Sequence, residues 1–208
     1  MMALKIQMFS DFICPFCYIG FEVMKGLQPE FGFELEWRGY QIHPEWPAEG
    51  IPAEKVREGS SAEVRRSAWE RISAMADAVG LEMRLPSVLC KSRTALMAAE
   101  YAREVGKSDE FEERVYRAYF HDLENIGDDA VVARLATESG IDAGELDAAL
   151  KSGKYEMKLK NNALVANRRG VSGVPTFFIG DYPIVGAQSA EVMRQLLKRA
   201  HERFDTAG

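Results

Sequence analysis

Two cysteines three positions apart stand between a strand pattern and a helix pattern near the start of the chain. Apolar and polar side chains alternate over residues 4–8, which is typical of a half-buried strand. The segment Cys14-Pro15-Phe16-Cys17 follows, and apolar residues at helical spacing then predict a helix that stops near Pro29. A disulfide between residues this close closes almost no loop and adds little stability. The pair therefore indicates chemistry, and the fold must be built around a strand–turn–helix unit that presents it.

The expected position of the pair at a helix start suits thiol–disulfide exchange. This reaction needs one exposed thiolate and a second thiol close enough to release the mixed disulfide. Cys14 is expected at the helix N-terminus, where free N–H groups and the positive end of the helix dipole stabilise its anion. Pro15 suits the first helical position. In such motifs the pKa of the first thiol falls to ~3.5–7.5 from ~8.5, so Cys14 is expected to attack and Cys17 to resolve.

A zinc site is the main alternative for a Cys-x-x-Cys pair. A structural zinc ion takes four ligands, and the chain has no second paired motif. The other cysteine and histidine side chains are Cys90, His43, His121 and His201. Because they are scattered, we expect no metal. We interpret Cys90 as a core residue rather than a third redox thiol, His43 as a loop residue and His121 as a polar helix end.

A proline directly before an apolar strand is the second informative feature. Pro175 precedes the apolar run 176–179, although proline cannot donate to a sheet ladder. A cis Val174–Pro175 peptide would explain this position, because X-Pro bonds tolerate the cis form at a cost of only ~0.5–1 kcal/mol. The bend would expose backbone groups with which an extended substrate could pair. A trans proline that simply starts a strand is the alternative.

The remaining patterns predict strand–helix–strand, a helical block, and then strand–strand–helix. Residues 33–38 alternate as a second strand, and residues 41–60 form an irregular connection. From 61 to 170 every strong pattern is helical, with a cap expected at Asp128 and a capping box from Asp142 to Glu145.

The last part of the chain returns to a strand pattern. Residues 176–186 predict a hairpin that turns at 180–181. Ser189 is expected to cap a final helix. The apolar face of this helix is predicted to consist of Val192, Leu196, Leu197 and Ala200.

Charge and hydropathy exclude some classes of partner and location. The 208 residues carry a net charge of -6, which argues against nucleic acid or an anionic membrane as the main partner. No apolar stretch reaches the ~18 residues needed to span a bilayer, and the N-terminus has no signal-peptide pattern. Three cysteines are not a disulfide framework. We expect a soluble protein of the reducing cytoplasm.

At this point four ordered motifs resemble a known family. They are Phe9-Ser10-Asp11-Phe12-Ile13-Cys14-Pro15-Phe16-Cys17-Tyr18-Ile19-Gly20, Ala118-Tyr119-Phe120 with Asn125-Ile126-Gly127-Asp128, Gly170-Val171-Ser172-Gly173-Val174-Pro175-Thr176-Phe177, and Gly186-Ala187-Gln188-Ser189. The chain resembles the DsbA-type branch of the thioredoxin superfamily, and within it the FrnE-like members. The motifs span nearly the full length.

This resemblance implies an α/β, thioredoxin-like fold with a large all-helical insertion. The thioredoxin-like domain is expected in two segments, 1–60 and 171–208, and the inserted helical domain at 61–170. The implied activity is exchange of disulfides with protein or peptide thiols, with Cys14 attacking and Cys17 resolving. A homodimer is also expected. The implied substrate-binding residues are Pro15, Phe16, Val174, Pro175, Gln188 and Ser189.

The resemblance also brings in glutathione-dependent relatives. Kappa-class glutathione transferases and 2-hydroxychromene-2-carboxylate isomerases are similar in architecture, but they typically carry serine where Cys14 stands. Retention of both cysteines favours dithiol redox work without a further cofactor. The alternative is a transferase or isomerase acting on small molecules, with glutathione as co-substrate near Val174 and Gln188-Ser189.

One departure from the family pattern concerns the residue between the cysteines. Periplasmic DsbA proteins carry histidine there, which helps to stabilise the thiolate, whereas this chain has Phe16. The sequence therefore does not determine the reduction potential within the family range of roughly -270 to -120 mV. We expect a reductase or isomerase rather than a bulk oxidase. A chaperone or redox-sensing protein, suggested by the aromatic helix faces, is a third interpretation.

Overall fold

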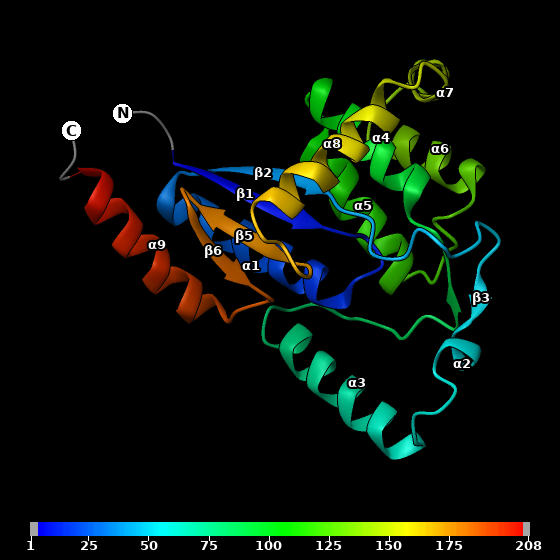
Figure 1. Cartoon of the computed structure of the whole chain (residues 1–208), viewed down its shortest axis with the longest axis horizontal. Coiled ribbons are helices and arrows are strands. Elements are labelled where there is room, and N and C mark those ends of the chain that lie inside the picture. The colour runs from blue at the N-terminus through cyan, green and yellow to red at the C-terminus, as the bar shows by residue number, and fades with distance from the viewer. Residues whose placement is uncertain (1–3, 206–208) are drawn as a thin grey trace.

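The sheet brings together strands from both ends of the chain. The computed structural model describes residues 4–205, and its four-stranded sheet has the order β2-β1-β5-β6 (Figure 1). The strands are β1 (Lys5–Ser10), β2 (Glu34–Gly39), β5 (Thr176–Ile179) and β6 (Tyr182–Val185). β1 runs parallel to β2 and antiparallel to β5, and β6 returns antiparallel to β5 as the predicted hairpin. The thioredoxin-like fold predicted from the sequence is confirmed.

Helix α1 (Pro15–Phe31) follows β1 and lies behind the sheet in Figure 1. The predicted stop near Pro29 is confirmed, since the helix ends two residues later with this proline inside its last turn. Proline there removes only one intrahelical hydrogen bond close to a terminus. Gly32 ends the helix in the left-handed conformation (φ 62°), where its N–H donates to the Gln28 carbonyl at 2.8 Å.

Helix α9 (Ala190–Asp205) packs against α1. As predicted, Ser189 caps it, because its hydroxyl oxygen accepts a hydrogen bond from the Val192 N–H at 3.3 Å. The predicted apolar face is wrong at Val192, which is 41% exposed, whereas Met193 is buried beside Leu197. The apolar stripe is therefore shifted by one residue at its start.

Between the two halves of the sheet the chain is mainly helical. The helices are α3 (Ala62–Asp77), α4 (Arg93–Glu104), α5 (Ser108–Phe120), α6 (Asp129–Glu138), α7 (Ala143–Lys151) and α8 (Lys154–Arg168). Asp128 and Asp142 act as caps, accepting hydrogen bonds from the N–H groups of Ala130 and Glu145 at 2.8 Å. In the predicted capping box, the Glu145 carboxylate would accept a hydrogen bond from the Asp142 N–H. Instead it accepts one from the Tyr101 hydroxyl at 3.3 Å.

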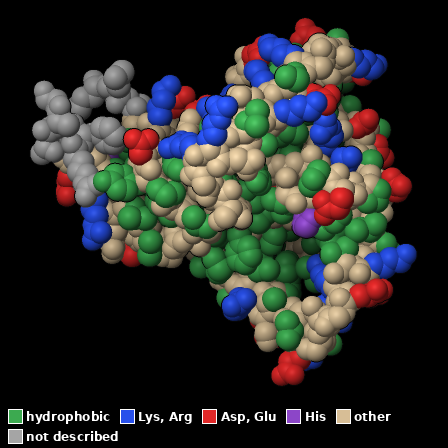
Figure 2. Space-filling view, viewed as in Figure 1, with side chains coloured by type: hydrophobic (Ala, Val, Ile, Leu, Met, Phe, Trp, Pro, Cys, Tyr) green, Lys and Arg blue, Asp and Glu red, His purple; other side chains and the backbone are tan. Residues whose placement is uncertain are grey.

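Two short strands and a one-turn helix interrupt this region. β3 (Ile51–Pro52) pairs with β4 (Val88–Leu89), and α2 (Ala53–Val56) follows β3. The sequence predicts only an irregular connection over 41–60, because elements of two to four residues are too short to show a period. On the face seen in Figure 2, apolar side chains gather between α3 and the rest of the molecule.

The helices and the sheet share a main apolar core, and a second, smaller cluster joins Phe9 and Phe178 of the sheet to Ala166 of α8 and to Val171. Helices α4 and α8 contact β2, and a single cluster of buried side chains runs from Ile6 and Met8 of β1 to Phe111 and Val115 of α5. The boundaries at residues 60 and 170 are therefore not visible as a break in the core, and the two-domain division stays a prediction. Residues 1–3 and 206–208 of its outer segments lie outside the described residues.

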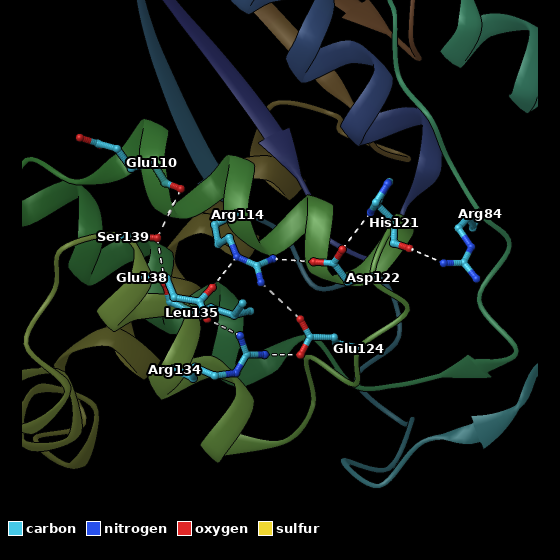
Figure 3. Close-up of polar contacts among 10 residues, drawn as sticks. All are labelled: Arg84, Glu110, Arg114, His121, Asp122, Glu124, Arg134, Leu135, Glu138 and Ser139. Atoms are coloured by element: carbon cyan, nitrogen blue, oxygen red, sulfur yellow. Dashed lines mark hydrogen bonds and ion pairs between the residues drawn. The ribbon is translucent and has the colours of Figure 1, made fainter.

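An ion-pair cluster fixes the end of α5 to the segments around it (Figure 3). The Arg114 guanidinium contacts the carboxylates of Asp122, Glu124 and Glu138 at 3.0, 3.4 and 2.6 Å. The Arg84 N–H donates to the Phe120 carbonyl at 2.6 Å, which ties the segment after α3 to the same helix end.

No helix within residues 4–205 is long and apolar enough to cross a membrane.

Candidate active site

Cys14 occupies the N-cap position of α1, with Pro15 at the first helical position. Its backbone is extended (φ -92°, ψ 116°), and its carbonyl accepts hydrogen bonds from the N–H groups of Cys17 and Tyr18 at 3.0 and 3.3 Å. The three cysteines are free thiols. Cys14 is 7% exposed and Cys17 is fully buried. Cys14 is therefore the more accessible residue of the pair.

The two thiols differ in their tendency to ionise. A hydrogen bond from the Cys17 thiol lowers the pKa of Cys14, and this effect outweighs the opposing cost of burial. Burial raises the pKa of Cys17 well above its ordinary value. The pair therefore consists of one thiol that ionises readily and a second that stays protonated beneath it, which is the asymmetry that stepwise disulfide exchange needs.

Residues from the far end of the chain border the Cys14 sulfur. The Val174–Pro175 peptide is cis, and the carbonyl oxygen of Val174 lies 3.6 Å from Cys14 Sγ, within hydrogen-bond distance of a thiol. Pro175 is buried. The structure thus brings the two sequence-predicted halves of the site together.

An aromatic group from α5 packs behind the cysteines, and the sequence analysis did not single it out. The Tyr116 ring stacks on Tyr18 at 4.9 Å between centroids, with planes 4° apart, and meets the edge of Phe12. Its hydroxyl lies 2.6 Å from the Ser10 hydroxyl at the end of β1. The only sequence signal is the aromatic face of α5, which indicates burial without naming the partner.

Asp11 is a buried carboxyl group three positions before Cys14. Its Oδ2 accepts a hydrogen bond from the Ile42 N–H at 2.8 Å, and its Oδ1 accepts one from the Ile13 N–H at 3.4 Å. Its backbone carbonyl accepts from the Cys14 N–H at 3.1 Å. Burial raises the pKa of Asp11 to about 6. These contacts allow Asp11 both to hold the turn before Cys14 and to act on the ionisation of its thiol.

For the other residues predicted to bind substrate, the structure gives no side-chain hydrogen bond to the cysteine pair. Phe16 is 36% exposed at the start of α1, and Pro15 is half-buried. The hydrogen bonds of Gln188 and Ser189 are local, because Gln188 Nε2 donates to the Val185 carbonyl at 3.0 Å and Ser189 caps α9. Their part in binding stays a prediction.

The remaining cysteine and the histidines have structural surroundings. Cys90 is buried, and burial raises its pKa to about 11. The His43 ring stacks on Trp46 at 3.9 Å and contacts Glu45 at 2.8 Å. His121 contacts Asp122 at the end of α5, also at 2.8 Å. Among the described residues, His, Cys, Asp and Glu side chains form no group of three or more that could hold a metal ion.

Comparison with known families bears directly on this geometry. A family model described as the DSBA-like thioredoxin domain matches residues 5–198. The chain belongs to this family. The match includes the helix start with its two cysteines and the Val174–Pro175 segment, so the DsbA-like resemblance predicted from the sequence is confirmed. The coarse activity that goes with it is that of a DsbA-like oxidoreductase family.

Two relatives of this DsbA-like chain are similar over nearly their whole length. The uncharacterised protein YwbO of Bacillus subtilis is 29% identical over 201 residues, which cover 94% of this chain and 96% of YwbO. The structure of a probable DsbA oxidoreductase from Streptomyces coelicolor, SCO1869, matches with 27% identity and a TM-score of 0.87. The match covers 96% of this chain and 90% of the SCO1869 chain.

Two further solved structures share the fold of the DsbA-like chain at lower identity. A 2-hydroxychromene-2-carboxylate isomerase has a TM-score of 0.78 at 17% identity. The match covers 99% of this chain and 100% of the isomerase chain. The cytosolic disulfide reductase DsbM from Pseudomonas aeruginosa, solved with GSH, has a TM-score of 0.67 at 17% identity, covering 98% of both chains. At these identities the likeness concerns the fold alone.

Proposed function

We propose that this DsbA-like chain is a thiol–disulfide oxidoreductase that exchanges disulfides with protein or peptide thiols through Cys14 and Cys17. The observation that carries the proposal is the asymmetry of the two thiols at the start of α1. Cys14 is the more exposed residue, and a hydrogen bond from the Cys17 thiol lowers the pKa of Cys14, whereas burial raises the pKa of Cys17.

In the reductive direction, the reaction proceeds by two displacements at sulfur. The Cys14 thiolate attacks one sulfur of a substrate disulfide, so that a Cys14–substrate disulfide forms and the second substrate sulfur leaves as a thiolate. Cys17 then loses its proton and attacks Cys14 Sγ. This step forms the Cys14–Cys17 disulfide and releases the first substrate sulfur as a thiolate. The substrate gains two electrons and the enzyme dithiol loses two. In isomerisation, the same substrate molecule gives these two electrons back to the enzyme.

The backbone beside Cys14 supports the binding of an extended substrate. The Val174 carbonyl borders the Cys14 sulfur at 3.6 Å, and the exposed Phe16 follows Cys14 by two positions in the chain. A peptide that presents its disulfide to Cys14 would pass both groups. Main-chain pairing of this kind tolerates many sequences, which suits a general substrate class.

Insulin reduction with dithiothreitol as electron donor tests the proposal. We expect Cys14→Ser to abolish the turbidity that accompanies reduction, and Cys17→Ser to accumulate a mixed disulfide on Cys14. Cys90→Ser is the matched control and should keep wild-type turnover, since burial raises the pKa of Cys90 to about 11. Wild-type turnover in Cys14→Ser would remove the proposal.

Glutathione-dependent chemistry on small molecules is the second candidate. It is supported by the shared fold with an isomerase and with DsbM, which was solved with GSH. This candidate requires glutathione to bind beside Val174 whether or not position 14 is a cysteine. Calorimetry with millimolar glutathione on Cys14→Ser is the test, and absence of heat at that concentration contradicts it.

The direction of electron flow, the cytoplasmic location and the homodimer remain predictions. A redox titration of the Cys14–Cys17 couple against glutathione would fix the direction, because a low potential favours a reductase and a high potential an oxidase. Light scattering on the purified chain would measure the oligomeric state.

A further inference from the structure

Asp11 combines complete burial with hydrogen bonds from neutral groups. Its side chain has no exposed surface, and its carboxylate oxygens accept from the backbone N–H groups of Ile13 and Ile42. Neutral N–H donors stabilise a carboxylate but do not cancel its charge. An ionised Asp11 therefore acts electrostatically on other groups in its surroundings, because the low dielectric of the interior screens little.

The titratable groups that interact electrostatically with Asp11 come from four segments. They are Cys14 at the start of α1, His43 in the loop after β2, Cys90 before α4 and Tyr119 in α5. His43 favours the ionised form of Asp11. The negative charge of Asp11 acts in the other direction on Cys14, since it disfavours the thiolate.

The backbone links Asp11 to the same cysteine. The Asp11 carbonyl accepts the Cys14 N–H at 3.1 Å, and the carboxylate holds the Ile42 N–H of the following loop at 2.8 Å. One residue thus joins the turn that carries Cys14 to the segment after β2. A turn held from both sides keeps the sulfur in one place relative to the helix start.

We propose that Asp11 is a positioning residue for the dithiol: its carboxylate anchors the Cys14 turn to the loop after β2, and its charge opposes ionisation of the Cys14 thiol. The proposal rests on the function proposed above and deepens it. Protonation of Asp11 removes the opposing charge, so the two groups titrate as a coupled pair rather than independently.

Titration of the cysteine Cβ carbons by NMR tests the charge effect directly. The chain has only three cysteines, so 13C-labelled cysteine gives three signals that single Cys→Ser variants assign. In Asp11→Asn we expect Cys14 to ionise at lower pH than in the wild type. Alkylation of Cys14 by iodoacetamide at pH 7, where Asp11 with its pKa of about 6 is mostly ionised in the wild type, should be faster in Asp11→Asn, by up to roughly threefold for a change of half a pKa unit.

The matched control is Asp77→Asn, which removes one negative charge from an exposed position at the end of α3. It should leave the Cys14 titration unchanged. Asp11→Asn with a native near-ultraviolet circular dichroism spectrum and an unchanged Cys14 titration would overturn the proposal. A purely structural role would change the melting temperature without moving this titration.

The reciprocal measurement covers the case in which Asp11→Asn fails to fold. Linkage requires that the Cys14 thiolate affect Asp11 as much as Asp11 affects the thiolate. In Cys14→Ser, the carboxyl carbon of Asp11 should therefore titrate at lower pH than in the wild type, and an identical titration would refute the coupling. Neither readout depends on turnover, so a chain without insulin reductase activity that shows the coupling would sink the proposed function and leave this inference standing.

Discussion

The hydroxyl oxygens of Ser10 and Tyr116 lie 2.6 Å apart, although 106 positions separate the two residues in the chain. Ser10 ends β1, one turn before the cysteine pair, and its hydroxyl also lowers the pKa of Cys17 against the larger effect of burial. Tyr116 belongs to α5. A helix of the inserted region thus supports the strand end from which the cysteines emerge.

Removing this hydrogen bond should destabilise the chain. In Tyr116→Phe the buried Ser10 hydroxyl loses this hydrogen bond but keeps its interaction with Cys17, so the cost should be that of one hydrogen bond, about 0.5–1.5 kcal/mol. Urea unfolding would measure the change. The double variant Ser10→Ala/Tyr116→Phe should be more stable than the sum of the single effects predicts, because the shared hydrogen bond is lost only once. Strict additivity would show that the two groups do not interact.

The buried carboxyl group of Glu112 should make stability depend on pH. Burial raises the pKa of Glu112 to about 8, above its value of ~4.3 in an unfolded chain. The folded state therefore binds the proton more tightly, so the stabilisation is complete below pH ~4.3 and is lost as the pH rises towards 8. The loss amounts to about 5 kcal/mol at ~1.36 kcal/mol per pKa unit.

Glu112→Gln removes this dependence and keeps the acceptor for the Ser108 hydroxyl, which donates to the carboxyl group at 2.7 Å. Relative to the wild type, the variant should gain unfolding free energy as the pH rises from 5 to 8. Glu63→Gln, at an exposed position in the first turn of α3, is the control and should show a flat difference. A flat difference for Glu112→Gln would contradict the prediction.

Gly127 has no room for a side chain. A Cβ there would lie 2.5 Å from the Ala48 carbonyl oxygen and 3.0 Å from that of Lys91. Both atoms are backbone and cannot move aside cheaply, so Gly127→Ala should lower the unfolding free energy by about 1–3 kcal/mol. Gly26→Ala in α1 meets nothing within 4 Å. It should raise stability by about 0.5–1 kcal/mol, and opposite signs in thermal unfolding are the expected outcome.

The three thiols should react with iodoacetamide at very different rates. At pH 7 the native chain should be modified at Cys14 about tenfold or more faster than at Cys90, since one pKa unit changes the thiolate population tenfold and the pKa of Cys90 is raised to about 11 by burial. Peptide mass spectrometry after brief labelling would measure this. In urea all three should react alike, and native labelling of Cys90 at the rate of Cys14 would refute the ordering.

Local patterns in the sequence predicted most elements of this fold. The alternation over residues 4–8 and the helical spacing of 92–120 each depend on neighbours within two turns, and they match β1, α4 and α5. Errors occurred where a neighbour distant in sequence decides the outcome. Met193 rather than Val192 is buried because of how α9 meets α1, and β3 exists only through its pairing with β4.

The site divides in the same way. Cys14, Cys17 and Pro175 are visible in the sequence, because two cysteines at a helix start and a proline before a strand are rare in a purely structural role. The role of Tyr116 and the contact of Asp11 with Ile42 are not visible in the sequence. A single sequence does not say which helix packs behind a turn or which loop reaches a carboxylate.

The contact between Cys14 Sγ and the Val174 carbonyl spans 160 positions of the chain. During synthesis at ~5–20 residues per second, both thiols leave the ribosome roughly ten to thirty seconds before the segment that borders them has been made. For that interval the nascent chain carries an unshielded pair of cysteines, open to oxidation and to wrong partners. The complete site therefore cannot form until Pro175 has been synthesised, and a reducing environment is expected to protect the two thiols until then.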